Sequence, residues 1–178
     1  MSRVKQIPTG ASGITAAAGW EVTTYGTPAM YRSVFRAKSS AALSAIAGGA
    51  ALGVGDLVGS FPAGELIVHA SGMDIALQQT EGNVTADTPD LGFGTTVASG
   101  AVSVLSGTAA FENLLTGQTM NDCDGTFETK TVGTQLVIAT ADSHDIYLNA
   151  ADTWAASGDA ALGIVGVYEV LWTPIGGN

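Results

Sequence analysis

The chain has 178 residues, enough for one full hydrophobic core or at most two small ones. Charged residues make up only 12% of it, against roughly 25% in an average globular protein, and the net charge is −10. An acidic balance argues against nucleic acid as the main partner, because phosphate binding needs clustered Lys and Arg. A weakly charged surface packs well against other subunits, so we expect an oligomer.

The basic residues are concentrated near the N-terminus. Residues 1–38 hold five of the six Lys and Arg and a single acid, Glu21, for a net charge of +4, whereas residues 39–178 carry −14. Isolated aromatics among Gly and Pro predict an extended arm here. Such an arm can dock on an acidic neighbour, the alternative being a solvated tail. The predicted partner contacts are Arg3, Lys5, Tyr31, Arg32, Phe35, Arg36 and Lys38.

Beyond the arm, the hydrophobic pattern changes from helix-compatible to strand-like. Residues 41–46 fit either a short helix or a buried, glycine-rich strand. Residues 66–68 form an apolar run, Ser71-Gly72 predicts a turn, and residues 73–78 alternate in the way typical of a half-buried strand. Residues 108–115, TAAFENLL, are the best candidate for a short helix, with Thr108 as its N-cap.

The final segment, residues 162–172 (LGIVGVYEVLW), is apolar on both faces, which predicts a strand in the middle of a sheet. In all, the pattern indicates roughly eight or nine strands and no helix–strand alternation. The predicted fold is all-β, a jelly-roll-like antiparallel β-sandwich with an extended N-terminal arm. We predict an arm with an Ala/Gly-rich connector over residues 1–55 and the sandwich over residues 56–178.

Few residues are candidates for chemistry. His69 and His144 are far apart in sequence, which gives little support to a catalytic or metal-binding pair. A single cysteine, Cys123, excludes an internal disulfide, and its neighbours Asp122 and Asp124 disfavour the thiolate.

Two Asp-rich segments are better explained as turns than as cation sites. Residues 121–125 resemble the start of a calcium loop but lack the acid at its twelfth position, and residues 87–90 hold two carboxylates around a Pro. Glycine-rich residues 48–55 and 92–94 match no phosphate-binding fingerprint and are interpreted as spacers or bulges. We therefore predict no enzymatic activity, catalytic residue, metal or cofactor.

Neither export nor membrane insertion is expected. The first ten residues, MSRVKQIPTG, lack the apolar core of a signal peptide. Residues 41–54 are too short and too weakly hydrophobic to span a bilayer. We expect a soluble protein made in a cytoplasm.

Two long segments within residues 56–172 resemble a group of small virion structural proteins of tailed bacteriophages, particularly marine ones. They are FPAGELIVHASGMDIALQQTEGNVTADTPDLGFGTTVASGAVSVLSGTAAFENLLTGQTMNDCDGT and IYLNAADTWAASGDAALGIVGVYEVLW. The resemblance implies a capsid decoration or cement protein with a jelly-roll fold, made in the host bacterial cytoplasm and located on the capsid surface of the virion. Such proteins bind the outer shell and bridge neighbouring subunits, which stabilises the capsid. Residues 1–38 lie outside the resemblance.

The expected partners are thus the phage major capsid protein and copies of the chain itself, as a dimer or trimer, with no nucleic acid and no membrane. One alternative is a carbohydrate-binding or host-adhesion module of a tail or head fibre, with Trp20, Trp154 and Trp172 as sugar-stacking platforms. Another is a jelly-roll capsid shell protein that assembles by itself into closed particles.

Overall fold

The computed structural model describes residues 6–7, 12–27, 29–48, 51–106 and 110–175. Within these residues the chain forms strands, turns and loops and no helix, which confirms the predicted all-β class. The strands are β1 (Gln6–Ile7), β2 (Thr15–Ala16), β3 (Trp20–Thr27), β4 (Met30–Ala37), β5 (Ala42–Ile46), β6 (Ala51–Ser60), β7 (Leu66–Gln79), β8 (Asp90–Gly94), β9 (Leu115–Thr119), β10 (Asp124–Ile138), β11 (Asp145–Thr153) and β12 (Asp159–Pro174).

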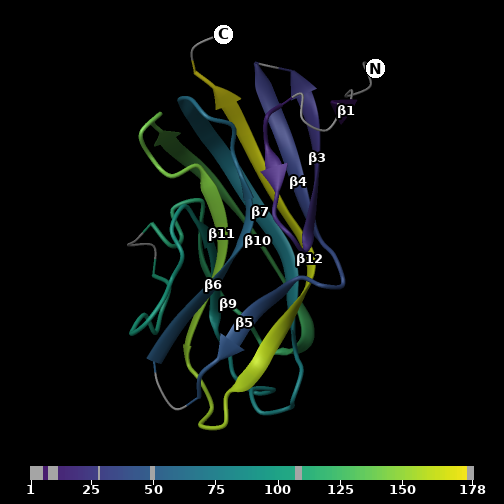
Figure 1. Ribbon diagram of the computed structural model, residues 1–178, viewed down its shortest axis with the longest axis vertical. Coiled ribbons are helices and arrows are strands. Elements are labelled where there is room, and N and C mark those ends of the chain that lie inside the picture. Colours follow the sequence, from purple (N-terminus) through teal and green to yellow (C-terminus); the bar gives the residue numbers. More distant parts are fainter. Residues whose placement is uncertain (1–5, 8–11, 28, 49–50, 107–109, 176–178) are drawn as a thin grey trace.

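These strands form two antiparallel sheets that pack into a sandwich (Figure 1). Sheet A has the order β1-β3-β4-β12-β7-β10, and β5 also pairs with β12. Sheet B has the order β2-β6-β11-β8-β9.

The pairing of eight of these strands defines a jelly roll. The chain runs as one long hairpin in which β8 pairs with β9, β7 with β10, β6 with β11 and β4 with β12. The hairpin is wrapped so that β7 also pairs with β12 and β8 with β11. The wrapping gives two four-stranded sheets, β4-β12-β7-β10 and β6-β11-β8-β9, as in jelly rolls. The predicted jelly-roll-like sandwich is therefore confirmed.

The core lies between the two sheets and is fixed by the period-two alternation of the strands. β12 pairs with strands on both sides, as its doubly apolar sequence predicts. Its side chains Tyr168, Val170 and Trp172 point inward and are fully buried. Phe93 of β8 stacks on Tyr168 and so joins the two sheets across the core.

The predicted N-terminal arm is wrong for the described residues between 12 and 38. β3 and β4 form a hairpin, and β4 pairs with β12. Trp20, Tyr31 and Phe35 are buried in the core because each occupies an inward position of its strand. The predicted boundary at residue 55 is also wrong, since β6 crosses it. Residues 1–5 and 8–11 lie outside the described residues.

Neither of the two segments for which a helix was possible, residues 41–46 and 108–115, is helical in its described part. Residues 42–46 form β5, so the strand alternative is confirmed there. The predicted helix over residues 108–115 is wrong in its described part, because Leu114 donates its backbone N–H to Phe93 and Leu115 begins β9. Pairing with β8 outweighs the weak local helix propensity of this segment. Thr108, the predicted N-cap, lies outside the described residues.

Candidate interaction surface

The outer face of sheet B is covered by the chain's own β8–β9 segment, described over residues 95–106 and 110–114. The buried Asn149 of β11 holds this segment in place. Its Oδ1 accepts a hydrogen bond of 2.7 Å from the Ala98 N–H, and its Nδ2 donates to the carbonyls of Thr96 and Phe111. Figure 1 shows the segment, in teal, alongside β6 and β11.

Glycines in sheet B leave room for this segment. A Cβ on Gly94 would collide with the backbone of Ala110 and Phe111, and one on Gly55 would collide with the Asn149 Oδ1. The glycine-rich stretches interpreted as spacers therefore allow close packing between the sheet and its covering segment.

The outer face of sheet A is different, because it presents apolar side chains to solvent. Seven large hydrophobic side chains are exposed among the described residues, and four of them lie on this face. These four are 46–52% exposed and come from three strands: Met30 of β4, Val165 of β12, and Phe127 and Val137 of β10. By strand register, Val165 and Phe127 flank Ala76 at one end of the face, and Val137 lies beside Ile67 at the other end, with polar residues such as Asp74 and Thr131 between them.

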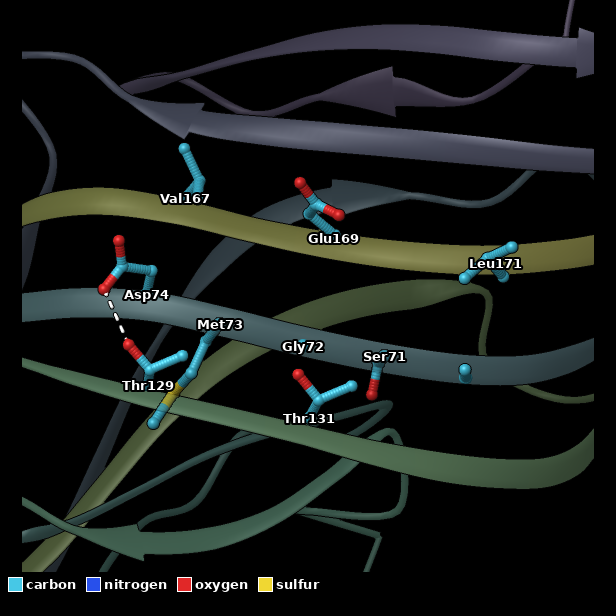
Figure 2. Close-up of a pocket in the computed structure, with 10 residues that line it drawn as sticks. Ser71, Gly72, Met73, Asp74, Thr129, Thr131, Val167, Glu169 and Leu171 are labelled. Carbon is cyan, nitrogen blue, oxygen red and sulfur yellow. Dashed lines mark hydrogen bonds between the residues drawn. The ribbon is translucent and has the colours of Figure 1, made fainter.

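A shallow hollow of about 230 Å³ lies on the same face, across β12, β7 and β10 (Figure 2). It forms where Gly72 of β7 has no side chain between its two cross-strand neighbours, Glu169 and Thr131. At one end, the Thr129 hydroxyl donates a 3.0 Å hydrogen bond to the Asp74 carboxylate. The hollow thus combines small and apolar lining residues with fixed polar groups.

Basic residues border this surface along β4. The Arg32 guanidinium donates two hydrogen bonds to Glu169, from Nε over 3.0 Å and from Nη2 over 2.5 Å. Hydrogen bonding to Glu169 raises the pKa of Arg32 above its ordinary value. Arg36 lies 3.8 Å from Glu21, and both side chains are more than half exposed. Two hydrogen bonds therefore hold the Arg32–Glu169 pair, whereas the Arg36–Glu21 pair is long and exposed to solvent.

The predicted partner contacts divide into three groups. Arg32, Arg36 and Lys38 are exposed, on β4 or just after it. Tyr31 and Phe35 are wrong as contacts, because strand alternation turns them into the core, where their rings lie 4.7 Å from Trp172 and 6.0 Å from Tyr168 between centroids. Arg3 and Lys5 lie outside the described residues.

Sequence reasoning missed the apolar outer face itself. The sequence does show that the outer side of β12 is apolar, because Val165, Val167 and Leu171 occupy the positions that alternate with its core residues. From the sequence alone, apolar residues on both faces of a strand indicate only that it lies in the middle of a sheet. They also line or adjoin the hollow.

The histidines and the cysteine are engaged in local structure. His69 lies 2.9 Å from the Thr173 hydroxyl, and the two ring nitrogens of His144 lie 2.9 and 2.7 Å from the carbonyls of Asp142 and Gly64. Burial, followed by the nearby Asp87 and Asp152, raises the pKa of Cys123 to about 12. The thiol therefore stays protonated at neutral pH and is a poor nucleophile.

Of the two Asp-rich segments, the one at residues 121–123 bends before β10, whereas the turn predicted over residues 87–90 is wrong, because residues 87–89 are irregular and Asp90 begins β8. Asp122 accepts hydrogen bonds from the Asp124 N–H and the Thr126 hydroxyl, which lower the pKa of its carboxyl group. Asp87 accepts from the Ala155 N–H, and Asp90 accepts from a loop N–H and a hydroxyl. No group of three or more His, Cys, Asp or Glu in the described residues is arranged to hold a metal ion.

All three tryptophans are buried: Trp20, Trp154 and Trp172 are at most 3% exposed. They anchor the core and cannot act as sugar-stacking platforms in this conformation. The sandwich therefore lacks the aromatic residues on which the carbohydrate-binding alternative depended.

No protein-family model matches the chain, and no curated protein matches it. Among the described residues, no helix is long and apolar enough to cross a membrane.

Proposed function

We propose that this chain is a structural protein of a phage virion, a capsid decoration or cement protein that binds the outer shell and bridges neighbouring subunits. The observation that carries the proposal is the difference between the two outer faces of the sandwich. One is covered by the chain's own β8–β9 segment, held by Asn149, and the other leaves Met30, Phe127, Val137 and Val165 exposed.

The chemistry of sheet A suits a protein partner. Its outer face combines apolar side chains with charges in fixed positions, above all the Arg32–Glu169 pair. Apolar contacts supply attraction, whereas charges at fixed positions select the orientation of the partner. The resemblance to phage virion proteins and the jelly-roll fold, which recurs in viral capsid domains, support the same assignment.

The proposed mechanism needs no catalysis. Each copy places its sheet A face against the major capsid protein at a junction between shell subunits, and the same contact is repeated over the lattice. Many modest contacts then give a large avidity when copies are linked to one another. The virion's capsid surface is the corresponding location, and the major capsid protein and further copies of the chain are the partners.

Two matched valines test which face binds. Val165 on sheet A is 52% exposed, and Val104 on the β8–β9 segment is 56% exposed. Val165→Lys should abolish co-sedimentation with shells of the major capsid protein, because it places a charge in an apolar contact. Val104→Lys should bind as the wild type does.

Electron microscopy of the purified virion, with this chain labelled, provides the independent test. The proposal expects label over the whole capsid surface. Label confined to tail or head fibres would favour the host-adhesion alternative, and purified chain that closes into particles by itself would favour the shell alternative. Either result, or equal binding by both lysine variants, would overturn the proposal.

A further inference from the structure

β10 forms an open edge of sheet A. It is 15 residues long and pairs with β7 on one side, and none of the described strands pairs with its other side. Between Phe127 and Gly133 its register with β7 is regular, with irregularities before and after this stretch. A regular edge strand presents unpaired backbone N–H and C=O groups, which are able to pair with another strand.

Edge strands of natural proteins are commonly protected by proline, by β-bulges or by inward-pointing charges. β10 has the last two: its register is irregular at both ends of the regular stretch, and Glu128 and Lys130 face inward, opposite the buried Ile75 and Met73. Its sequence, DGTFETKTVGTQLVI, contains no proline. Its two charges in the regular stretch, Glu128 and Lys130, have opposite signs and lie two residues apart, on the same face of the sheet. Opposite charges at this spacing nevertheless permit a strand of the same sequence to pair alongside.

We propose that β10 pairs antiparallel with β10 of a second copy, in the register that places Thr129 opposite Thr129 of that copy, so that sheet A continues across a two-fold axis. The charge pattern selects this register. In an antiparallel pair of identical strands related by a two-fold axis, one residue must face its own counterpart. With Thr129 at the axis, Glu128 faces the second copy's Lys130 and Lys130 faces its Glu128.

Neighbouring registers of the β10 pair give less favourable cross-strand charge contacts. With Lys130 or Glu128 at the axis, like charges face each other directly, which destabilises a strand pair. With Thr131 at the axis, Lys130 faces Val132 and Glu128 loses its charged partner. Only the Thr129 register, among those centred between Glu128 and Thr131, gives two opposite-charge pairs.

The surrounding contacts favour the same pairing. Lys130 donates from Nζ to the Gly117 carbonyl over 2.8 Å, and Glu128 accepts from the Asn121 side chain. These bonds limit the motion of both charged groups, so less conformational freedom is lost on pairing. On the outer face, Phe127, half exposed in one copy, would lie opposite Thr131 of the second, and aromatic and β-branched side chains form favourable cross-strand pairs.

The inference deepens the self-association part of the proposed function, because a dimer built this way carries two sheet A faces side by side. It is tested on the purified chain alone, without capsid shells. The dimer and the capsid-binding face can therefore fail independently.

Charge reversal tests the interface. Light scattering coupled to size exclusion should show a dimer for the wild type. Glu128→Lys and Lys130→Glu should each give a folded monomer, because each places like charges opposite one another, and the double variant with both substitutions should restore the dimer. A monomeric wild type, or single variants that are folded by circular dichroism and still dimeric, would overturn the proposal.

Cysteine cross-linking tests the register. Thr129→Cys should form an intermolecular disulfide on mild oxidation, since its counterpart lies directly opposite. Thr131→Cys is the matched control, because it would lie four strand positions from its counterpart, about 13 Å away and beyond disulfide reach. The buried Cys123 does not compete. Cross-linking of both variants, of neither, or of Thr131→Cys alone would contradict the register.

Discussion

Phe93 of sheet B and Tyr168 of sheet A stack almost in parallel, with ring centroids 3.8 Å apart and an interplanar angle of 9°. Both side chains are fully buried, and Tyr168 lies on the strand that pairs with both β4 and β7. The stack therefore fixes the two halves of the jelly roll against each other at the centre of the core.

The Tyr168 hydroxyl contributes little to that stack. Burial raises the pKa of Tyr168, an effect only partly opposed by the nearby Ser71, and the hydroxyl makes no hydrogen bond of normal geometry with any described residue. We expect Tyr168→Phe to leave the free energy of unfolding unchanged or raise it by about 1 kcal/mol, because a buried hydroxyl without a partner is costly. Phe93→Ala should lower it by about 3–5 kcal/mol. Urea unfolding measures both, and a large loss in Tyr168→Phe would show that the hydroxyl is satisfied.

The sandwich was predictable because its strongest signals are local. The alternation in β7 and the doubly apolar sequence of β12 depend only on residues close together in the chain. The place of residues 20–37 was not predictable in the same way. Trp20, Tyr31 and Phe35 look like isolated aromatics until their strands are paired, and charge composition alone favoured an arm.

Predicting the interaction surface requires knowledge of contacts between residues still farther apart in the sequence. Whether an outer face is bare or covered is decided by a loop from elsewhere in the chain, here the β8–β9 segment held by Asn149. Nothing in the spacing of Val165 or Phe127 indicates that sheet A, and not sheet B, is left exposed. The glycines that admit the covering segment were visible, but their role requires knowledge of what approaches them.

Asn149→Ala should release the β8–β9 segment from sheet B. The substitution removes three hydrogen bonds to buried or half-buried groups and leaves their partners unsatisfied, so we expect a loss of about 2–4 kcal/mol. Hydrogen exchange should show lost protection at the Ala98 amide, and limited proteolysis should cut between β8 and β9. Asn113→Ala is the control: the Asn113 side chain bonds Thr95 from a half-buried position, and its loss should cost about 1 kcal/mol or less. Equal effects would show that Asn149 has no special role.

Asp159 gives stability that depends on pH. Burial raises the pKa of its carboxyl group, but hydrogen bonds from Thr80, Glu81 and Ala161 outweigh burial and hold it below the ordinary value of 3.8. A lowered pKa in the folded state means that this stability is present above about pH 4 and is lost as the pH falls through the folded-state value.

Asp159→Asn should therefore lower the free energy of unfolding by about 1–3 kcal/mol at pH 7, and its difference from the wild type should shrink below pH 4. Urea titrations across this range measure the difference. Asp142→Asn serves as a control, because this exposed carboxylate accepts one backbone bond within its own turn and should change stability little. A deficit in Asp159→Asn that stays constant with pH would contradict the assignment.

Residues 1–38 supply strands that pack in the core and exposed basic side chains. A deletion and a substitution distinguish these two contributions. Deleting residues 1–38 removes β3 and β4, and with them the buried Trp20, Tyr31 and Phe35, so we expect loss of the cooperative thermal transition. The triple variant Arg32→Ala, Arg36→Ala and Lys38→Ala removes exposed charges only. It should remain folded, since exposed ion pairs contribute little, while binding capsid shells more weakly. A deletion variant that still melts cooperatively would mean that this hairpin is dispensable for the core.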